Sequence, residues 1–229
     1  GKKVLIIDLD PQGNASTGLG IDYEQRNLTV YDVLLAEAAI SSAILPTSMA
    51  GLDIVPSTVD LSSADIELIK TPNHSTALSR ALVEDKTLAD NYDFIFVDCP
   101  PSLSLLTINA MVVSDSVLIP LQSEFFALEG LSQLMLSVRE VRKSVNTRLR
   151  FEGVVLTMFD RRNNLSQQVE KDARENLGEL VFKTVIPRNV RVSEAPSHSV
   201  PVLTYEPRSR GAQAYRRLAK EFLKNNKSI

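Results

Sequence analysis

The sequence has few of the residues on which several classes of protein depend. Its 229 residues include no Trp, two His and a single Cys, Cys99. One cysteine excludes a disulfide framework, and it excludes a cysteine-rich zinc or iron–sulfur site built by one chain. His74 and His198 have no second His or Cys at ligand spacing, which argues against a metal role for either. No apolar run reaches membrane-spanning length and no signal peptide opens the chain, so we expect a protein of the reducing cytoplasm.

Composition and charge say more about organisation. Apolar residues make up 44% of the chain, enough for one sizeable core, so a single domain over residues 1–229 is expected. The net charge of −3 hides a split, because residues 1–138 carry 6 Lys and Arg against 18 Asp and Glu, whereas residues 139–229 carry 19 against 10. The basic half indicates either a surface that faces a polyanion or a set of solvated helix faces.

Short apolar runs alternate with helical patterns along the whole chain, which predicts a doubly wound α/β fold with a mostly parallel sheet covered on both faces. Apolar stripes at helical spacing predict helices over 128–145 and 212–224. The predicted strands are 4–8, 52–56, 94–98, 116–120, 153–158 and 182–186.

Two of these strands end in carboxylates followed by turn-forming residues: Asp8-Leu-Asp-Pro-Gln-Gly-Asn and Asp98-Cys-Pro-Pro-Ser. Ligands of doubly wound sheets gather at the carboxyl ends of strands, where an Asp can hold Mg²⁺ directly or through water. A single Asp in this position can equally cap the next helix, and for Asp8 we favour that bracing role.

At this point five strings resemble one family. Asp8-Leu-Asp-Pro-Gln-Gly-Asn-Ala-Ser, Asp98-Cys-Pro-Pro-Ser and Ala127-Leu-Glu-Gly-Leu-Ser-Gln-Leu are similar to segments of the ParA/Soj chromosome- and plasmid-partitioning ATPases. Ile186-Pro-Arg-Asn-Val-Arg and Tyr205-Glu-Pro-Arg-Ser-Arg-Gly-Ala continue the match in the family's order over essentially the whole chain. The resemblance implies a P-loop NTPase fold that uses ATP and Mg²⁺.

The resemblance also implies roles for particular residues. Asp10 matches the carboxylate that orients the attacking water, and Asp98 matches the acid that holds Mg²⁺ at the β- and γ-phosphates. Pro101 and Ser102 match a switch loop that reports γ-phosphate. The adenine-side positions are Pro187, Arg188 and Asn189.

One element of the family pattern is missing. Members carry a phosphate-binding loop, Lys-Gly-Gly-x-x-x-Lys-Thr, ahead of the Asp-Leu-Asp-Pro strand, and none of the nine glycines here lies in such a string. We therefore interpret the chain as truncated before that strand, with a gap in the sheet beside 94–98 and little affinity for ATP by itself.

For the complete protein, the resemblance implies an ATP-dependent homodimer that binds double-stranded DNA without sequence preference. A ParB-like partner would stimulate slow hydrolysis and reset the switch on the nucleoid. Arg162 and Arg191 match family positions that contact DNA. Arg161, Arg216, Arg217, Lys220 and Lys224 could extend that basic surface, or the last four could simply be the solvated face of the C-terminal helix.

Two alternatives remain open from the sequence. A MinD-like ATPase would cycle on membranes, although the short polar end of this chain argues against stable membrane association. A non-catalytic scaffold of the same fold would have no need for both Asp10 and Asp98.

Overall fold

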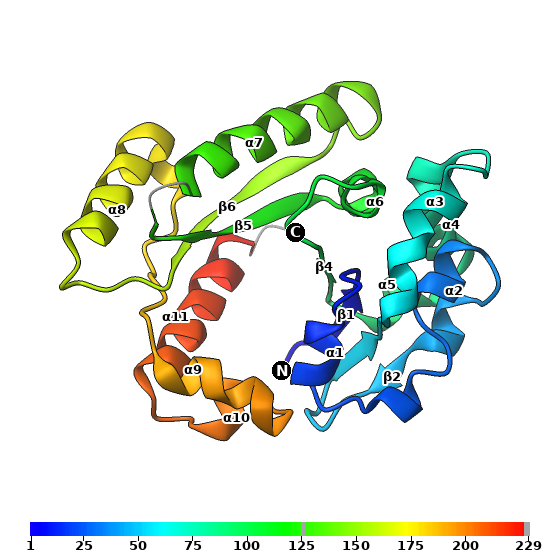
Figure 1. Cartoon of the computed structure of the whole chain (residues 1–229), viewed down its shortest axis with the longest axis horizontal. Helices are drawn as coiled ribbons and strands as arrows, with labels where there is room; N and C mark the ends of the chain where they lie inside the picture. Colours follow the sequence, from blue (N-terminus) through cyan, green and yellow to red (C-terminus); the bar gives the residue numbers. More distant parts are fainter. Residues whose placement is uncertain (125–126, 227–229) are drawn as a thin grey trace. The chain divides into compact units, whose positions relative to one another are not determined.

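The computed structural model describes residues 1–124 and 127–226, and the chain divides into two compact units, Gly1–Ser114 and Asp115–Ile229. Figure 1 labels their elements. The strands are β1 (Val4–Asp8), β2 (Leu45–Pro46), β3 (Leu52–Val55), β4 (Phe94–Asp98), β5 (Ser116–Gln122) and β6 (Arg150–Thr157). The helices are α1 (Asn14–Gly18), α2 (Val30–Leu34), α3 (Ala64–Leu68), α4 (Ala77–Glu84), α5 (Thr87–Asn91), α6 (Leu105–Val113), α7 (Ala127–Ser144), α8 (Asn164–Leu177), α9 (Val190–Glu194), α10 (Val202–Tyr205) and α11 (Arg210–Asn225).

The N-terminal unit contains a four-stranded sheet in the order β2-β3-β1-β4. β1 runs parallel to both β3 and β4, and only the short β2 is antiparallel. Leu5, Ile7 and Leu9 are fully buried, and the core around them includes residues of α2 to α6. This arrangement places the carboxyl ends of β1 and β4 side by side.

β4 is the edge strand of this sheet, since it pairs with β1 and with no other strand of the described residues. Phe94 and Phe96 project from the same face of β4 and stack with ring centroids 6.3 Å apart. Phe96 is 39% exposed, so this face is less covered than the face toward the core. The edge beside β4 is the one at which the sequence predicts a missing strand.

The C-terminal unit is built on the parallel pair β5 and β6, with helices on both faces (Figure 1). Ile119 and Leu156 face a core formed with α7 and α8. Val155 faces the opposite side, where Ala214 of α11 packs. Successive side chains of these strands therefore point into two separate apolar layers, as predicted for a sheet that is covered on both faces. The helices expected over 128–145 and 212–224 appear as α7 and α11.

The predicted sixth strand, 182–186, is wrong. The segment forms no strand, and only isolated bridges flank it, between Val181 and Val154 and between Pro187 and Phe159. Phe182 N–H does donate to Val154 C=O at 2.9 Å, and Ile186 N–H to Leu156 C=O at 2.8 Å. The Lys183 and Thr184 amides, however, donate to the Glu221 carboxylate of α11, at 2.7 and 2.9 Å. A side chain thus replaces a strand partner and interrupts the ladder.

No helix in the parts of the chain that the structure describes is both long and apolar enough to cross a bilayer.

Gly153 of β6 offers a test of the packing in this unit. Its φ is +150°, and a Cβ there would lie 2.5 Å from Phe182 Cε2 and 2.8 Å from Leu180 O. We expect Gly153→Ala to lower the free energy of unfolding by about 2 kcal/mol or more, because backbone and ring must both move. Urea unfolding followed by circular dichroism measures the loss.

Gly130 is the matched control, because it lies in α7 and a Cβ there has no atom within 4 Å. Gly130→Ala should raise the free energy of unfolding by about 0.5–1 kcal/mol through helix propensity. Equal effects of the two substitutions would contradict the close contact at Gly153.

Candidate functional site

Three carboxylates lie at the adjoining ends of β1 and β4. Asp8 and Asp98 are paired in the parallel register, and Leu9 N–H donates to Asp98 C=O at 2.8 Å. Asp10 follows two residues after Asp8. The structure thus brings together the two Asp residues that the sequence analysis selects, Asp10 and Asp98, with Asp8 beside them.

Asp8 is fully buried and braces the loop after β1. Its Oδ2 accepts hydrogen bonds from the Ser16 amide at 2.8 Å and the Ser16 hydroxyl at 2.6 Å. Ser16 Oγ in turn accepts from the Ser57 amide at 3.1 Å. Burial raises the pKa of the Asp8 carboxyl, while the hydrogen bonds from Ser16 act in the opposite direction. These contacts tie together the end of β1, helix α1 and the loop after β3.

The loop that carries Asp10 is held in a tight turn. Asp10 Oδ1 accepts from the Gln12 amide at 3.0 Å, and the Gly13 amide donates to Asp10 C=O at 2.9 Å. Gly13 has φ +61°, and a Cβ there would lie 2.7 Å from Arg26 Nη1 and 3.0 Å from Ser57 O. A glycine is therefore required here. No described residue donates a hydrogen bond to Asp10 Oδ2, which leaves that oxygen for a ligand or water.

Arg26 clamps this turn from outside. Its guanidinium donates to Ser57 C=O at 3.0 Å, to Thr17 Oγ1 at 2.9 Å and to Ile21 C=O at 2.7 Å. The sequence analysis did not select Arg26, Ser16 or Ser57. The sequence held one signal for Arg26, since it is the only Lys or Arg between Lys3 and Lys70 in an otherwise acidic stretch.

Asp98 experiences the negative charge of its neighbours. Burial raises its pKa to about 6, and the charges of Asp8 and Asp10 add to the shift. Asp98 is exposed to solvent at the edge strand, so water screens part of this repulsion. A cation bound here would relieve this repulsion.

The described residues contain no group of three or more His, Cys, Asp or Glu side chains placed to hold a metal ion by itself. An ion at Asp98 would need further oxygen ligands from water or from a phosphate.

Cys99 and the loop after β4 complete this region. Burial raises the pKa of the Cys99 thiol to about 12, with further contributions from the charges of Asp98 and Asp10. The thiol therefore stays protonated at neutral pH, in keeping with a packing role. Pro101 and Ser102 are exposed, and Ser102 C=O accepts from the Thr107 hydroxyl at 2.6 Å.

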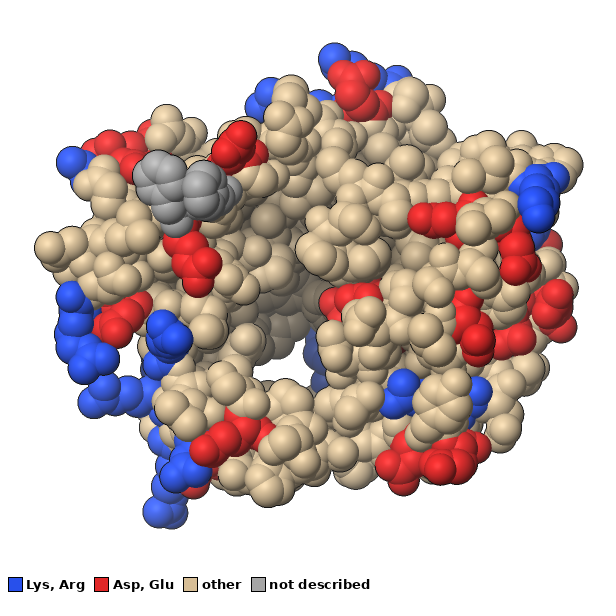
Figure 2. Space-filling model, in the orientation of Figure 1, with Lys and Arg blue, Asp and Glu red and all other residues tan. Residues whose placement is uncertain are grey.

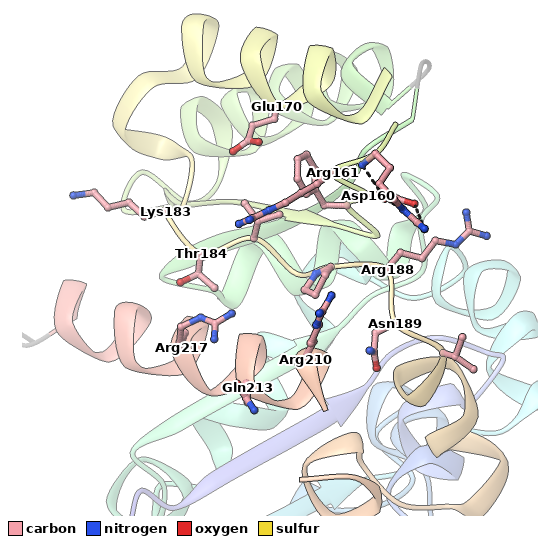
Figure 3. Close-up of a pocket in the computed structure, with 15 residues that line it drawn as sticks. Asp160, Arg161, Glu170, Lys183, Thr184, Arg188, Asn189, Arg210, Gln213 and Arg217 are labelled. Carbon is pink, nitrogen blue, oxygen red and sulfur yellow. Dashed lines mark hydrogen bonds and ion pairs between the residues drawn. The ribbon is translucent and has the colours of Figure 1, made fainter. Parts of the chain in front are cut away.

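A cleft of about 1210 Å³ lies in the C-terminal unit, between the loop after β6, the segment 183–190 and α11 (Figure 3). Pro187, Arg188 and Asn189, the predicted adenine-side residues, all line it. Asn189 Oδ1 is buried and has no hydrogen-bond donor among the described residues. A Cβ on Gly211 would lie 3.2 Å from this oxygen, so α11 begins directly against Asn189.

The two arginines predicted to contact DNA are both paired with carboxylates. Arg162 lines the cleft and donates to Asp160 through Nε at 3.2 Å and Nη2 at 3.1 Å, which lowers the pKa of Asp160. Arg191 is not among the cleft-lining residues, and it forms an ion pair with Glu194 at 2.7 Å.

Basic charge is concentrated in this unit. On the face that Figure 2 shows, Lys and Arg side chains gather over the C-terminal unit, and Asp and Glu are more frequent over the N-terminal unit. Six cations line the cleft against two acids, Asp160 and Glu170. Two of the six were not selected from the sequence, Lys183 and Arg210, because they lie far apart along the chain.

Comparisons with known proteins agree on the family. Residues 1–151 match the model of the AAA domain family. The chain is 54% identical to the chromosome partitioning protein ParA of Caulobacter vibrioides over 223 residues, which cover 97% of this chain and 83% of that protein. It is 52% identical to the sporulation initiation inhibitor protein Soj of Bacillus subtilis, over 98% of this chain and 88% of Soj.

Solved structures show the same fold. Cobyrinic acid a,c-diamide synthase from Mycobacterium smegmatis is similar with a TM-score of 0.84 and 33% identity, covering 100% of this chain and 84% of that one. That enzyme has also been solved with a bound ATP analogue and magnesium. The cell division ATPase MinD of Pyrococcus furiosus is similar with a TM-score of 0.79 and 28% identity, over 98% of this chain and 86% of MinD.

Substitution of Ser16 tests the hydrogen bonds that join Asp8, Ser16 and Ser57 beside the Asp10 turn. We expect Ser16→Ala to lower the free energy of unfolding by about 1–3 kcal/mol, because the buried Asp8 carboxylate loses a donor and the Ser57 amide loses its acceptor. Chemical denaturation measures it. Ser132→Ala is the control, since Ser132 is exposed and bonds only Leu128 C=O of its own helix. A loss no larger than that of the control would contradict the brace.

Proposed function

The chain belongs to the ParA/Soj family of chromosome-partitioning ATPases, and on this premise we propose that the complete protein is an ATP-dependent DNA-partitioning switch. The observation that carries the proposal is the set of three carboxylates at the ends of β1 and β4, with Asp10 in a tight turn closed by the Gln12 amide and Gly13. Phosphoryl transfer depends on positioning and charge stabilisation more than on covalent chemistry by the protein. A rigid loop that presents one free carboxylate oxygen suits that task.

Asp10 is the proposed catalytic residue. Its Oδ1 is engaged by the Gln12 amide, so Oδ2 is the oxygen that accepts a hydrogen bond from the attacking water and fixes its direction. The bracing of Asp8 by Ser16 keeps the turn from relaxing when the water leaves.

Asp98 is the proposed Mg²⁺ residue. The fit rests on its charge environment, since Asp8 and Asp10 disfavour a bare carboxylate at this position and a divalent cation offsets them. When bound, Mg²⁺ would neutralise charge on the β- and γ-phosphates. The part of the chain that is described would supply one carboxylate ligand there, and phosphate and water the remainder.

Pro187, Arg188 and Asn189 are the proposed adenine-side residues. The buried, unpaired Asn189 Oδ1 is an acceptor that an exocyclic amine such as that of adenine satisfies. Pro187 presents an apolar surface beside it for the flat base.

We further propose that a phosphate-binding strand pairs with β4 in the complete ATPase. The open edge of β4 and the exposed ring of Phe96 are the supporting features, because an apolar edge strand without a partner is unfavourable in water. On this proposal the single ATPase domain includes that strand, and residues 1–229 alone bind ATP weakly and are inactive.

DNA binding by the ATP-bound homodimer completes the proposed cycle. Arg162, Arg191 and the excess of basic residues after residue 138 favour neutralisation of phosphates without base reading. The γ-phosphate would shift the population toward the dimer, and hydrolysis stimulated by a ParB-like protein would return it to the monomer. The location on this proposal is the nucleoid, in the cytoplasm.

The similarity to MinD favours one second candidate, a membrane-cycling ATPase. Against it, the apolar side of α11 is occupied, since Ala214, Leu218 and Phe222 pack on the β5–β6 sheet. Residues 227–229, part of the polar end considered for anchoring, lie outside the described residues. Co-sedimentation with anionic vesicles, without DNA binding, would favour this candidate.

Asp10→Ala tests catalysis in the complete protein. We expect the ATP hydrolysis rate to fall by about 100-fold or more, because the water loses its orienting acceptor. ATP binding and DNA binding should persist, so the variant should remain on DNA. A phosphate-release assay and a DNA mobility shift measure the two. Asp90→Ala, at an exposed position in α5, is the control, and unchanged hydrolysis by Asp10→Ala would refute the assignment.

Arg191→Glu tests the DNA surface. We expect loss of DNA binding with ATP binding retained, because a like charge replaces a phosphate ligand beside Glu194. Fluorescence anisotropy with a labelled duplex measures the first, and a fluorescent nucleotide the second. Arg139→Glu, on the exposed face of α7, is the control. Simultaneous loss of both activities would instead assign Arg191 to the nucleotide site or to folding.

A further inference from the structure

Three cations of the cleft come from three separate elements. Arg161 lies in the loop after β6, Lys183 in the segment before Pro187, and Arg217 in α11, and all three line the same cleft. We call them the basic cluster. In Figure 3, Lys183, Thr184 and Arg217 lie toward one end of the cleft, and Arg188 and Asn189 toward the other.

The backbone beneath the basic cluster is firmly held. Glu221 accepts from the Lys183 and Thr184 amides at 2.7 and 2.9 Å, which fastens this segment to α11. Arg217 precedes Glu221 by four residues, so both lie on one face of the helix. Arg161 C=O accepts from the Gln167 side chain at 2.8 Å. The three cations therefore stand on a preorganised frame.

Ion pairing separates the basic cluster from Arg162 and Arg191, while Arg188 and Arg210 of the same cleft are likewise in no ion pair among the described residues. Arg161, Lys183 and Arg217 form no ion pair with any residue that the structure describes. The nearby Glu170 is engaged by Arg174, with Nη2 at 2.9 Å. Arg162 and Arg191, in contrast, must share or release a carboxylate before they neutralise a phosphate.

We propose that the basic cluster is a primary contact for the phosphodiester backbone of double-stranded DNA, ahead of Arg162 and Arg191. This inference rests on the DNA binding proposed above, and it names the residues of the protein that would contact the DNA first. Unpaired cations lose no intramolecular partner on binding, so they contribute more affinity per phosphate. Phe159 is the only aromatic residue lining the cleft and is 8% exposed, so the cleft offers no platform on which single-stranded bases stack.

The test uses the complete protein with ATP and Mg²⁺, a fluorescein-labelled duplex of mixed sequence, and anisotropy at several salt concentrations. The variant combines Arg161→Gln, Lys183→Gln and Arg217→Gln. We expect the dissociation constant to rise by about tenfold or more near 0.1 M salt, and the slope of log affinity against log salt to fall by about 3. ATP binding should be unchanged.

The matched control removes the same charge from exposed α7 and loop positions outside the cleft, as Arg139→Gln, Arg142→Gln and Arg148→Gln. A conservative variant with Lys at 161 and 217 keeps the charge and should restore most of the affinity, which separates charge from folding. Equal DNA affinity of the Gln variant and the control would overturn the inference. Loss of ATP binding along with DNA binding would also overturn it and assign the cluster to nucleotide phosphates. If the wild-type protein binds no duplex, the proposed function itself fails.

Discussion

Full burial of the Asp8 carboxylate is the constraint on which the N-terminal unit depends. A carboxylate without exposure must be hydrogen-bonded: Ser16 in α1 supplies two donors to Oδ2, and the Asp10 amide donates to Oδ1 at 3.3 Å. Ser16 also receives the Ser57 amide, so one side chain connects β1, α1 and the loop after β3. Asp10 sits on the turn that these contacts bound, and Arg26 closes the turn from the solvent side.

In the C-terminal unit too, one carboxylate accepts hydrogen bonds from the backbone, but there it interrupts the sheet. Where a sixth strand is expected, Glu221 takes two backbone amides away from the sheet and attaches them to α11. The interruption lies between the bridges Val154–Val181 and Phe159–Pro187, and residues 183–185 line the cleft that Asn189 and the basic cluster share. Burial alone would raise the pKa of Glu221, but the donors from Thr184 and Lys183 outweigh it and lower the value, so the carboxylate stays charged.

Acidic and basic residues are distributed unequally between the two units, which the small net charge of the chain conceals. In the N-terminal unit, three carboxylates lie together at one pair of strand ends. In the C-terminal unit, cations outnumber acids along one cleft. Which arginines are free depends on local pairing, since Asp160 and Glu194 already engage the two that sequence similarity selects. The arginines chosen by sequence similarity are therefore not the same as the cleft cations that lack an ion pair.

The amino-acid sequence by itself determined the α/β class, five of six strands, the helices α7 and α11, and the carboxylates at two strand ends. Apolar period, turn residues and charge are local properties, and they can be followed along the chain without knowing its neighbours. Only the tertiary structure decided that residues 182–186 leave the sheet, because Glu221 is 37 residues away from Thr184. It also decided that Arg26 reaches Ser57 and that Lys183 and Arg217 share a cleft. Such contacts join distant segments through side chains, and no local pattern records them.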